Sequence, residues 1–168
     1  MNREGFELVD IFVQITNMVK VFNPQFKARI EKFLERQHFM KLIGFELTEI
    51  SEGKTEGWLT LGLEHQQQTG LVHGGVTATL ADIVAGFAAC TVVKEDQHVV
   101  TGEIKISYFA PGKGQKLFAK GWVVKQGKKM SFCEAEVWSV DGDKKTLIAK
   151  ATTSMVTIFP EDMSRREA

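Results

Sequence analysis

One apolar segment, residues 74–93, constrains the fold of this 168-residue chain more than any other feature. Its apolar residues fall on almost every side of a helix, and such a helix needs cover over most of its surface. The segment is close to membrane-spanning length, but Asp82 stands near its middle, together with threonines and a cysteine. We therefore expect a buried helix in a globular fold and no membrane span.

The sequence on either side of this helix alternates between apolar and polar residues, as half-buried strands do. A curled antiparallel sheet wrapped around the central helix satisfies the order of the elements, so the predicted fold class is α+β. Two strands are predicted before the helix and a four-strand meander after it, at residues 42–50, 56–61, 99–109, 115–125, 130–140 and 146–159.

Residues 6–39 are predicted to be helical and are rich in phenylalanine. Asn23-Pro24 divides them into two helices, because proline is favoured in a first helical turn. These extra N-terminal helices either close the core of the domain, or cover a ligand tunnel or an oligomer contact. The predicted organisation is a helical extension at 1–39, one domain at 40–160 and a polar tail at 161–168.

The bulk composition excludes several classes of function. The 21 basic and 21 acidic residues cancel, so no net charge draws the chain to nucleic acid or to anionic lipid. Cys90 and Cys133 lack the spacing of redox or zinc motifs and are expected to be buried, reduced thiols. His38, His65 and His98 have no partners at metal-ligand spacing, so we expect surface histidines and no metal site. Acidic residues near the N-terminus are unlike a signal peptide, which favours a cytoplasmic location.

The start of the apolar helix carries a pattern with chemical meaning. His73-Gly74-Gly75 opens the helix, and Asp82 follows two turns later. A helix start offers unpaired backbone N–H groups and a positive dipole end, and glycine leaves them accessible. Such an end suits a carbonyl oxygen that becomes negative during acyl transfer, while a carboxylate can act as base or nucleophile. An acid inside an apolar helix can also merely cap a neighbouring backbone group.

Three segments resemble the hotdog-fold acyl-CoA thioesterases, above all their PaaI branch, and are also similar to the Arthrobacter-type 4-hydroxybenzoyl-CoA thioesterase. The resemblance extends from about Phe39 to Phe159, so the N-terminal helices depart from the family. The segments are Gly70-Leu71-Val72-His73-Gly74-Gly75 with Leu80-Ala81-Asp82, the strand at residues 101–112, and the turn Lys125-Gln126-Gly127-Lys128.

The resemblance implies a role for four residues. Asp82 aligns with the family's catalytic carboxylate, and Gly74 with the glycine whose backbone N–H polarises the thioester carbonyl. Gln67 takes the place of an amide residue, Asn in the PaaI branch, that orients the thioester or the attacking water. Thr101 lies near a Ser or Thr that helps to hold this water. The exchange of Asn for Gln bears on substrate choice more than on reaction type.

Other residues are expected to support these four. His73 is interpreted as orienting the glycine loop, with direct catalysis and simple packing as alternatives. Gly75 can share the oxyanion role or merely permit close packing. Two basic turns are candidates for contacts with the phosphates of coenzyme A, although exposed lysines at turns are usually only solvated. The expected substrate-binding residues are Gly75, Gly127, Lys128, Lys129 and Lys113.

The resemblance further implies an active site between two subunits, in a homodimer or a dimer-of-dimers tetramer. The expected function is hydrolysis of an acyl-CoA thioester, with coenzyme A as part of the substrate and with no cofactor. Asp82 either activates a water or forms a mixed anhydride. A hotdog protein that only binds acyl-CoA is the alternative, and a hydratase or dehydratase is a weaker one. The acyl group stays open among medium or longer chains and aryl-acetyl groups.

Overall fold

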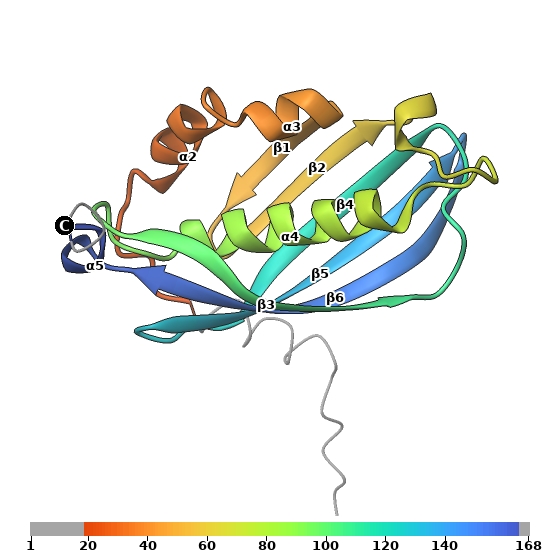
Figure 1. Cartoon of the computed structure of the whole chain (residues 1–168). Coiled ribbons are helices and arrows are strands. Elements are labelled where there is room, and N and C mark those ends of the chain that lie inside the picture. The colour runs from red at the N-terminus through yellow and green to blue at the C-terminus, as the bar shows by residue number, and fades with distance from the viewer. Residues whose placement is uncertain (1–18, 165–168) are drawn as a thin grey trace, which may run out of the picture.

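The computed structural model describes residues 19–164. One long helix lies along the concave side of a curled sheet, and two short helices lie beside it (Figure 1). The predicted fold is thereby confirmed. The elements are α2 (Phe26–Leu34), α3 (His38–Ile43), β1 (Phe45–Ser51), β2 (Lys54–Thr60), the 3₁₀ helix η1 (Leu63–His65), α4 (Gly74–Cys90), β3 (His98–Tyr108), β4 (Lys116–Lys125), β5 (Met130–Asp141), β6 (Lys144–Ile158) and α5 (Pro160–Ser164).

The sheet is antiparallel, with six strands in the order β1-β2-β4-β5-β6-β3. The prediction of a four-strand meander was wrong in one respect, because β3 does not pair with β4. It pairs instead with β6 at the edge of the sheet, while β4 pairs with β2 and β5. Alternation tells which face of a strand is buried but not which strand lies next to it.

Helix α4 approaches the sheet closely because small residues line the contact. A Cβ atom on Gly121 of β4 would lie 2.5 Å from the carbonyl carbon of Val84, so only glycine fits there. From β2, the buried Thr55 hydroxyl donates a 2.6 Å hydrogen bond to the carbonyl oxygen of Val84. These contacts fix α4 on β2 and β4 and leave its opposite side facing away from the sheet.

The N-terminal helices differ from their predicted bounds. Residues 6–18 of the first predicted helix lie outside the described residues, and residues 19–22 are not helical. The second predicted helix is split into α2 and α3, and α3 continues to Ile43, where a strand was expected. Gly44 ends it with a φ of 69°, the left-handed conformation that favours glycine. Strand β1 therefore begins at Phe45.

His65 contradicts the prediction of a surface histidine, because its side chain is buried. Its Nδ1 accepts a 2.8 Å hydrogen bond from the Gly62 N–H, and its Nε2 lies 2.9 Å from the carbonyl oxygen of Ile43. The ring thus joins η1 to the end of α3 and holds the start of the loop that leads to α4. His38 and His98 are exposed, as predicted.

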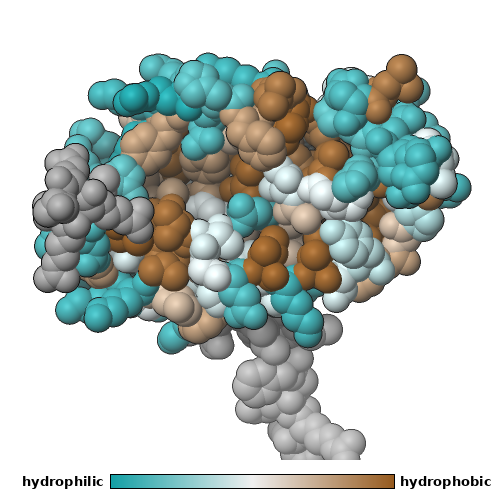
Figure 2. All heavy atoms as spheres, viewed as in Figure 1, coloured by the Kyte–Doolittle hydropathy of each residue, from teal (hydrophilic) through white to brown (hydrophobic). Residues whose placement is uncertain are grey.

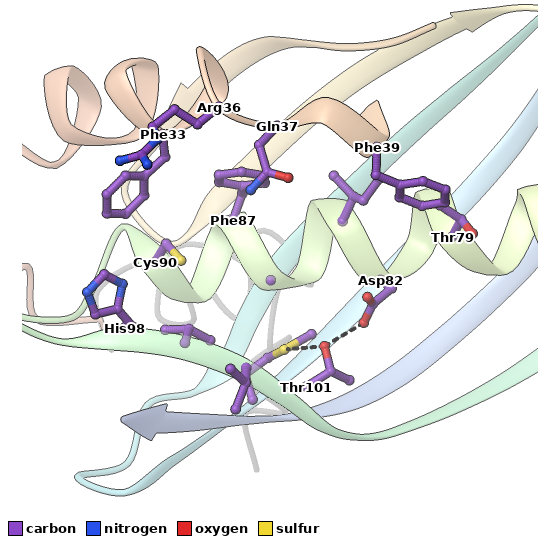
Figure 3. A pocket seen from close by; sticks show the side chains of 15 residues that line it. Phe33, Arg36, Gln37, Phe39, Thr79, Asp82, Phe87, Cys90, His98 and Thr101 are labelled. Atoms are coloured by element: carbon purple, nitrogen blue, oxygen red, sulfur yellow. Dashed lines mark hydrogen bonds between the residues drawn. The ribbon is translucent and has the colours of Figure 1, made fainter. Parts of the chain in front are cut away.

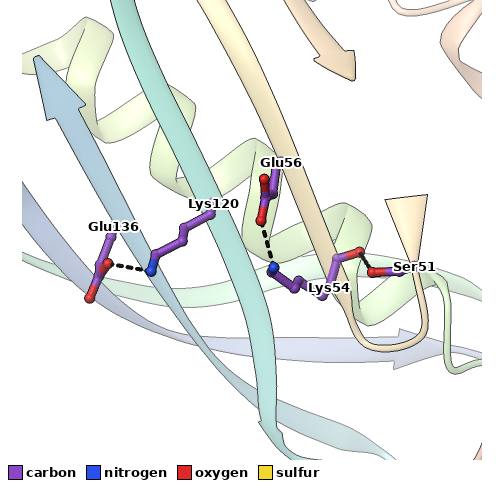
Figure 4. A network of polar contacts seen from close by, with 5 residues as sticks. All are labelled: Ser51, Lys54, Glu56, Lys120 and Glu136. Atoms are coloured by element: carbon purple, nitrogen blue, oxygen red, sulfur yellow. Dashed lines mark hydrogen bonds and ion pairs between the residues drawn. The ribbon is translucent and has the colours of Figure 1, made fainter. Parts of the chain in front are cut away.

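The outer face of the sheet carries aromatic rings and ion pairs. Lys120 of β4 lies 2.9 Å from Glu136 of β5, and Lys54 lies 2.5 Å from Glu56 on β2 (Figure 4). Such partly exposed pairs contribute about 0–1 kcal/mol each. Trp58 packs against Phe118 with ring centroids 4.8 Å apart.

Candidate active site

Asp82 and Thr101 meet where α4 faces β3, an edge strand of the sheet. The Thr101 hydroxyl donates a 2.7 Å hydrogen bond to Oδ1 of Asp82 (Figure 3). The carboxylate is half-buried, and no other hydrogen bond to it is present among residues 19–164. One carboxylate oxygen is therefore fixed by the threonine while the other remains available to a water or a substrate.

A bulge in β3 positions Thr101. The pairing with β6 shifts register between Thr101 and Glu103, so that Thr101 lies opposite the buried Met155. After the bulge, Ile104 lies opposite Thr153, which is also buried. Gly102 permits this close pairing, since a Cβ atom there would lie 2.9 Å from the side chain of Val156. The bulge thus allows Thr101 and the later residues of β3 to face α4, a task that bulges near active sites often perform.

A groove of about 530 Å³ extends from this pair along α4. Figure 2 shows the face of the molecule hollowed between the α2–α3 segment and β3, and Figure 3 shows α4 as the back wall. The lining is mostly apolar, with Asp82 as its carboxylate. The residues are Phe33, Arg36, Gln37, Phe39, Thr79, Asp82, Ile83, Gly86, Phe87, Cys90, His98, Val99, Val100, Thr101 and Met155.

The start of α4 forms a second, separate cavity of about 630 Å³. His73 is the N-cap of the helix, and its Nδ1 accepts a 2.9 Å hydrogen bond from the Gly75 N–H. No group in the described part of the chain accepts the Gly74 N–H. Gln67 lines the same cavity, in a loop that its backbone closes through bonds with Leu71 and Gly70. Two of the predicted residues, Gln67 and Gly74, are thus brought together beside a free backbone donor.

Sequence reasoning missed Tyr108 as a member of this second cavity. Its hydroxyl donates a 2.9 Å hydrogen bond to the carbonyl oxygen of Gly74, and its ring lies against the same glycine. The alternating pattern of residues 99–109 assigns Tyr108 only to a strand. Only the pairing of β3 with β6 brings its end to the start of α4, so the sequence held no signal for this contact.

The two cavities cannot act on one carbonyl group within a single chain. Gly74 and Asp82 are eight residues apart on one helix, about 12 Å at 1.5 Å per residue. A donor must lie about 3 Å from the oxygen that it stabilises, and a base or nucleophile must approach the same group as closely. A site that uses both residues therefore has to combine the two halves from two chains.

The predicted basic turns lie at opposite ends of the sheet. Lys113 is exposed and precedes β4, next to Gly112, which lines the cavity of Gly74. Gly127 and Lys128 line another cavity at the far end of β4, and Lys129 beside them is exposed. Of these three lysines, only Lys113 lies near the start of α4 of its own chain.

The described residues offer few ligands for a metal ion. Among the described residues, no group of three or more His, Cys, Asp or Glu side chains lies close enough to hold a metal ion. Cys90 and Cys133 are both free thiols, as expected; Cys133 is buried and Cys90 is half-buried. Burial raises the pKa of Cys90 to about 11 and that of Cys133 to about 12, so both remain protonated at neutral pH. No helix between residues 19 and 164 is long and apolar enough to cross a membrane.

Comparison with known proteins agrees with this architecture. The chain is similar to the 1,4-dihydroxy-2-naphthoyl-CoA thioesterase 2 of Arabidopsis thaliana, with 29% identity over 125 residues, 71% of this chain and 77% of the relative. It is 29% identical to human acyl-coenzyme A thioesterase 13 over 111 residues, 64% of this chain and 78% of the relative.

Two solved structures share the fold. The thioesterase family protein of Silicibacter pomeroyi superimposes with a TM-score of 0.78 and 23% identity, over 80% of this chain and 98% of that one. The PaaI protein of E. coli gives a TM-score of 0.72 and 20% identity, over 82% and 96%. The family model of the thioesterase superfamily matches residues 69–146, which include the loop, α4 and most of the following strands. The chain therefore has the hotdog fold of these structures and is similar to the thioesterase superfamily over residues 69–146.

Proposed function

We propose that this protein hydrolyses acyl-CoA thioesters to a free acid and coenzyme A. The observation that carries the proposal is the half-buried Asp82 carboxylate, held by the Thr101 hydroxyl at 2.7 Å where an apolar groove begins. A carboxylate in this setting can approach the carbonyl group of a bound thioester. The groove beside it can hold the acyl chain. The named activities of the relatives, which are thioesterases, agree with this chemistry.

The thioester carbonyl binds at the start of α4, where the Gly74 N–H is unpaired and the helix dipole is positive. As the carbonyl oxygen becomes negative in the transition state, this donor strengthens its hydrogen bond. A donor of this kind contributes about 3–4 kcal/mol to the barrier reduction. Gln67, in the same cavity, orients the thioester or the attacking water through its side-chain amide.

Asp82 supplies the second half of the reaction. In one route it takes a proton from a water that Thr101 helps to hold, and that water attacks the carbonyl carbon. In the other route the carboxylate attacks the carbon itself, and water then hydrolyses the mixed anhydride. In both routes the carbon–sulfur bond breaks, and the thiolate of coenzyme A leaves and takes a proton. Neither route requires a metal or a redox cofactor.

A second copy of the chain completes the site. Strand β3 lies at an edge of the sheet and pairs only with β6 among residues 19–164. Its Val100, Ile104 and Tyr108 are 48%, 37% and 52% exposed. Exposed apolar edges of this kind pair readily with another strand. An antiparallel pairing of two β3 edges would set the start of one α4 against the Asp82 of the other chain. It would also bring the basic turn at Lys128 of one chain toward Lys113 of the other, where both can contact the phosphates of coenzyme A.

The first test measures release of free thiol from acyl-CoAs by the wild type and by Asp82→Asn. We expect the asparagine variant to lose at least about 10²-fold in kcat, because it can neither accept a proton nor attack. Binding of acyl-CoA is measured in parallel. A wild type that binds acyl-CoA without turnover would instead identify a binding protein.

A pair of variants at Gly74 tests the oxyanion donor. Gly74→Pro replaces the N–H with a ring carbon without interrupting the helix, since proline is favoured at the first helical position and His73 already has extended backbone angles. Gly74→Ala is the matched control, and its Cβ would meet nothing closer than 3.5 Å. We expect the proline variant to lose about 10²-fold in kcat and the alanine variant to lose little.

Mixing the two inactive variants tests the shared site. If each site takes Gly74 from one chain and Asp82 from the other, a mixed dimer of Gly74→Pro and Asp82→Asn has one intact site and one doubly damaged site. Random mixing should then restore about a quarter of the wild-type activity per chain. No recovery in verified mixed dimers would place both residues' roles within one chain and contradict the two-chain site.

A further inference from the structure

We propose that the groove between α4, β3 and the α2–α3 segment is a straight-chain acyl pocket whose capacity is set by the bare backbone of Gly86 and by Phe33 at its far end. This inference rests on the proposed function and specifies its substrate: linear acyl groups of up to about ten carbons. It assigns a role to the N-terminal helices, which are the part of this chain that departs from the family.

The residues that line the groove change in character along α4. Asp82, Gly86 and Cys90 succeed one another at intervals of four residues, which places them on one face of the helix. Figure 3 shows the Asp82 carboxylate on one side and the Cys90 thiol toward the other end. Gly86, which has no side chain, lies between them in the helix. A chain bound by its carbonyl beside Asp82 would therefore cross the backbone at Gly86.

Gly86 is not required by packing. The nearest atom to a Cβ built on it is the Cε of Met155 at 4.0 Å, so alanine would fit without strain. Alanine is also the better helix former, and glycine inside a helix is destabilising. The missing side chain leaves space in the groove at a cost to the helix. The need to hold a ligand at this position would explain why a glycine is found here.

The far end of the groove is closed by a contact between two elements. The Phe33 ring of α2 stacks on the His98 ring of β3, with centroids 5.8 Å apart and an interplanar angle of 24°. Both residues line the groove, and Figure 3 shows them at the end away from Asp82. The α2–α3 segment thus supplies an end wall and, through Phe39, part of the upper wall.

The length of the groove gives the length of the chain. Asp82 and Cys90 are eight residues apart, or about 12 Å along the helix. An extended chain advances about 1.3 Å per bond, since three bonds span 3.8 Å between consecutive Cα atoms. Nine or so bonds therefore fit between the carboxylate and the closed end, which corresponds to an acyl group of about ten carbons.

The test compares kcat/KM for straight-chain acyl-CoAs of increasing length, from acetyl to palmitoyl, by release of free thiol. For the wild type we expect kcat/KM to rise with length up to about ten carbons, by as much as about four-fold for each buried methylene, and then to level off. Gly86→Leu should lower the value for decanoyl-CoA at least about ten-fold and leave acetyl-CoA within about two-fold. Gly86→Ala, the matched control, should change the profile far less.

Phe33→Ala provides a second variant, at the opposite end and on a different element. Removing this ring opens the end wall, so the optimum should move toward longer chains while acetyl-CoA is unaffected. A Gly86→Leu variant that is folded, by its circular dichroism and melting temperature, and that lowers all lengths equally or none would overturn the proposal. An unchanged chain-length optimum in Phe33→Ala would overturn the role of the N-terminal helices.

Binding of S-alkyl thioether analogues of acyl-CoA separates this inference from the proposed function. These analogues cannot be hydrolysed, and calorimetry measures their affinity directly. An affinity that rises with chain length and loses this rise in Gly86→Leu supports the pocket even if no thioester is turned over. Turnover with no dependence of either affinity or kcat/KM on length would retain the hydrolase and reject the pocket.

Discussion

The Thr101 hydroxyl donates a 2.7 Å hydrogen bond to the Asp82 carboxylate, and this bond joins the edge strand β3 to the central helix. The two residues belong to elements that the chain separates by a charged turn, and the bulge at Gly102 directs Thr101 toward the helix. The bond fixes the carboxylate in one orientation and leaves Oδ2 without a hydrogen bond from any described residue. Loss of this hydrogen bond should therefore lower kcat rather than the stability of the fold.

Thr101→Val removes this hydrogen bond with little change in shape. We expect kcat to fall about 10–100-fold, the usual cost of losing a group that orients a reacting residue. Thr101→Ser keeps the hydroxyl and should retain most of the activity. Steady-state kinetics on one acyl-CoA measures the effect, with melting temperatures as the control for folding. Equal activity of the valine and serine variants would show that the hydroxyl does not act on Asp82.

Tyr108→Phe removes the bond from the tyrosine hydroxyl to the Gly74 carbonyl. A neutral hydrogen bond of this kind contributes about 1 kcal/mol, so kcat should fall about five-fold while KM changes little. If Tyr108 acts by positioning Gly74, its loss should have no further effect in the Gly74→Pro background. A double-variant cycle measures this. Additive losses would mean that Tyr108 acts independently of the helix start.

Ile104→Asp places a charge on the exposed β3 edge, in the middle of the apolar surface expected to pair with a second chain. We expect the variant to sediment as a monomer and to lose activity, because the proposed site takes Gly74 from one chain and Asp82 from the other. Sedimentation velocity at several concentrations, with thiol release on the same samples, measures both. Lys105→Asp, on the other face of the strand, is the matched control. An active monomer would refute the shared site.

The two thiols predict a loss of stability in alkaline solution. Burial raises the pKa of Cys90 and Cys133 above the ordinary value of 9.0. The unfolded chain therefore releases these protons first, and stability that is complete below pH 9 is lost as the pH rises toward the folded values. In that interval each thiol lowers the free energy of unfolding by about 1.4 kcal/mol per pH unit. Urea unfolding of the wild type and Cys133→Ala between pH 8 and 10.5 should give a shallower slope for the variant. Identical slopes would contradict the assignment.

Much of the fold could be predicted because the apolar helix leaves few alternatives. A helix without a polar side had to be enclosed, and the alternating strands around it supplied the enclosing sheet. The position of β3 could not be predicted, since β3 and β6 carry the same alternation as any other pair that could be neighbours. The burial of His65 depends on the Gly62 N–H and the Ile43 carbonyl, which only the folded loop brings to the ring.

The candidate site, too, could be predicted only in part. The sequence predicted chemical roles for Gly74 and Asp82, because a helix start offers backbone donors and because both residues belong to the resemblance to the hotdog thioesterases. It could not reveal the bulge at Gly102, which breaks the period of two and turns Thr101 toward α4. The basic turns at Lys113 and Lys128 looked alike in sequence, yet β4 separates them by its whole length. In the proposed two-chain site they come together only through the packing of a second chain, which no local pattern encodes.

Two glycines, Gly121 of β4 and Gly86 of α4 itself, provide a final prediction about the packing of this helix. Gly121→Ala would place a Cβ 2.5 Å from the Val84 carbonyl carbon and 2.6 Å from the Ala85 nitrogen, backbone atoms that cannot move aside without shifting the helix. We expect the free energy of unfolding to fall by about 1–3 kcal/mol, as overpacked cores do. Gly86→Ala adds the same methyl group where the nearest atom is 4.0 Å away, and should stabilise by about 0.5–1 kcal/mol. Denaturant unfolding of both variants at neutral pH measures the difference. If Gly86→Ala were as destabilising as Gly121→Ala, packing would account for both glycines, whereas opposite signs leave the space above Gly86 to be explained by a ligand.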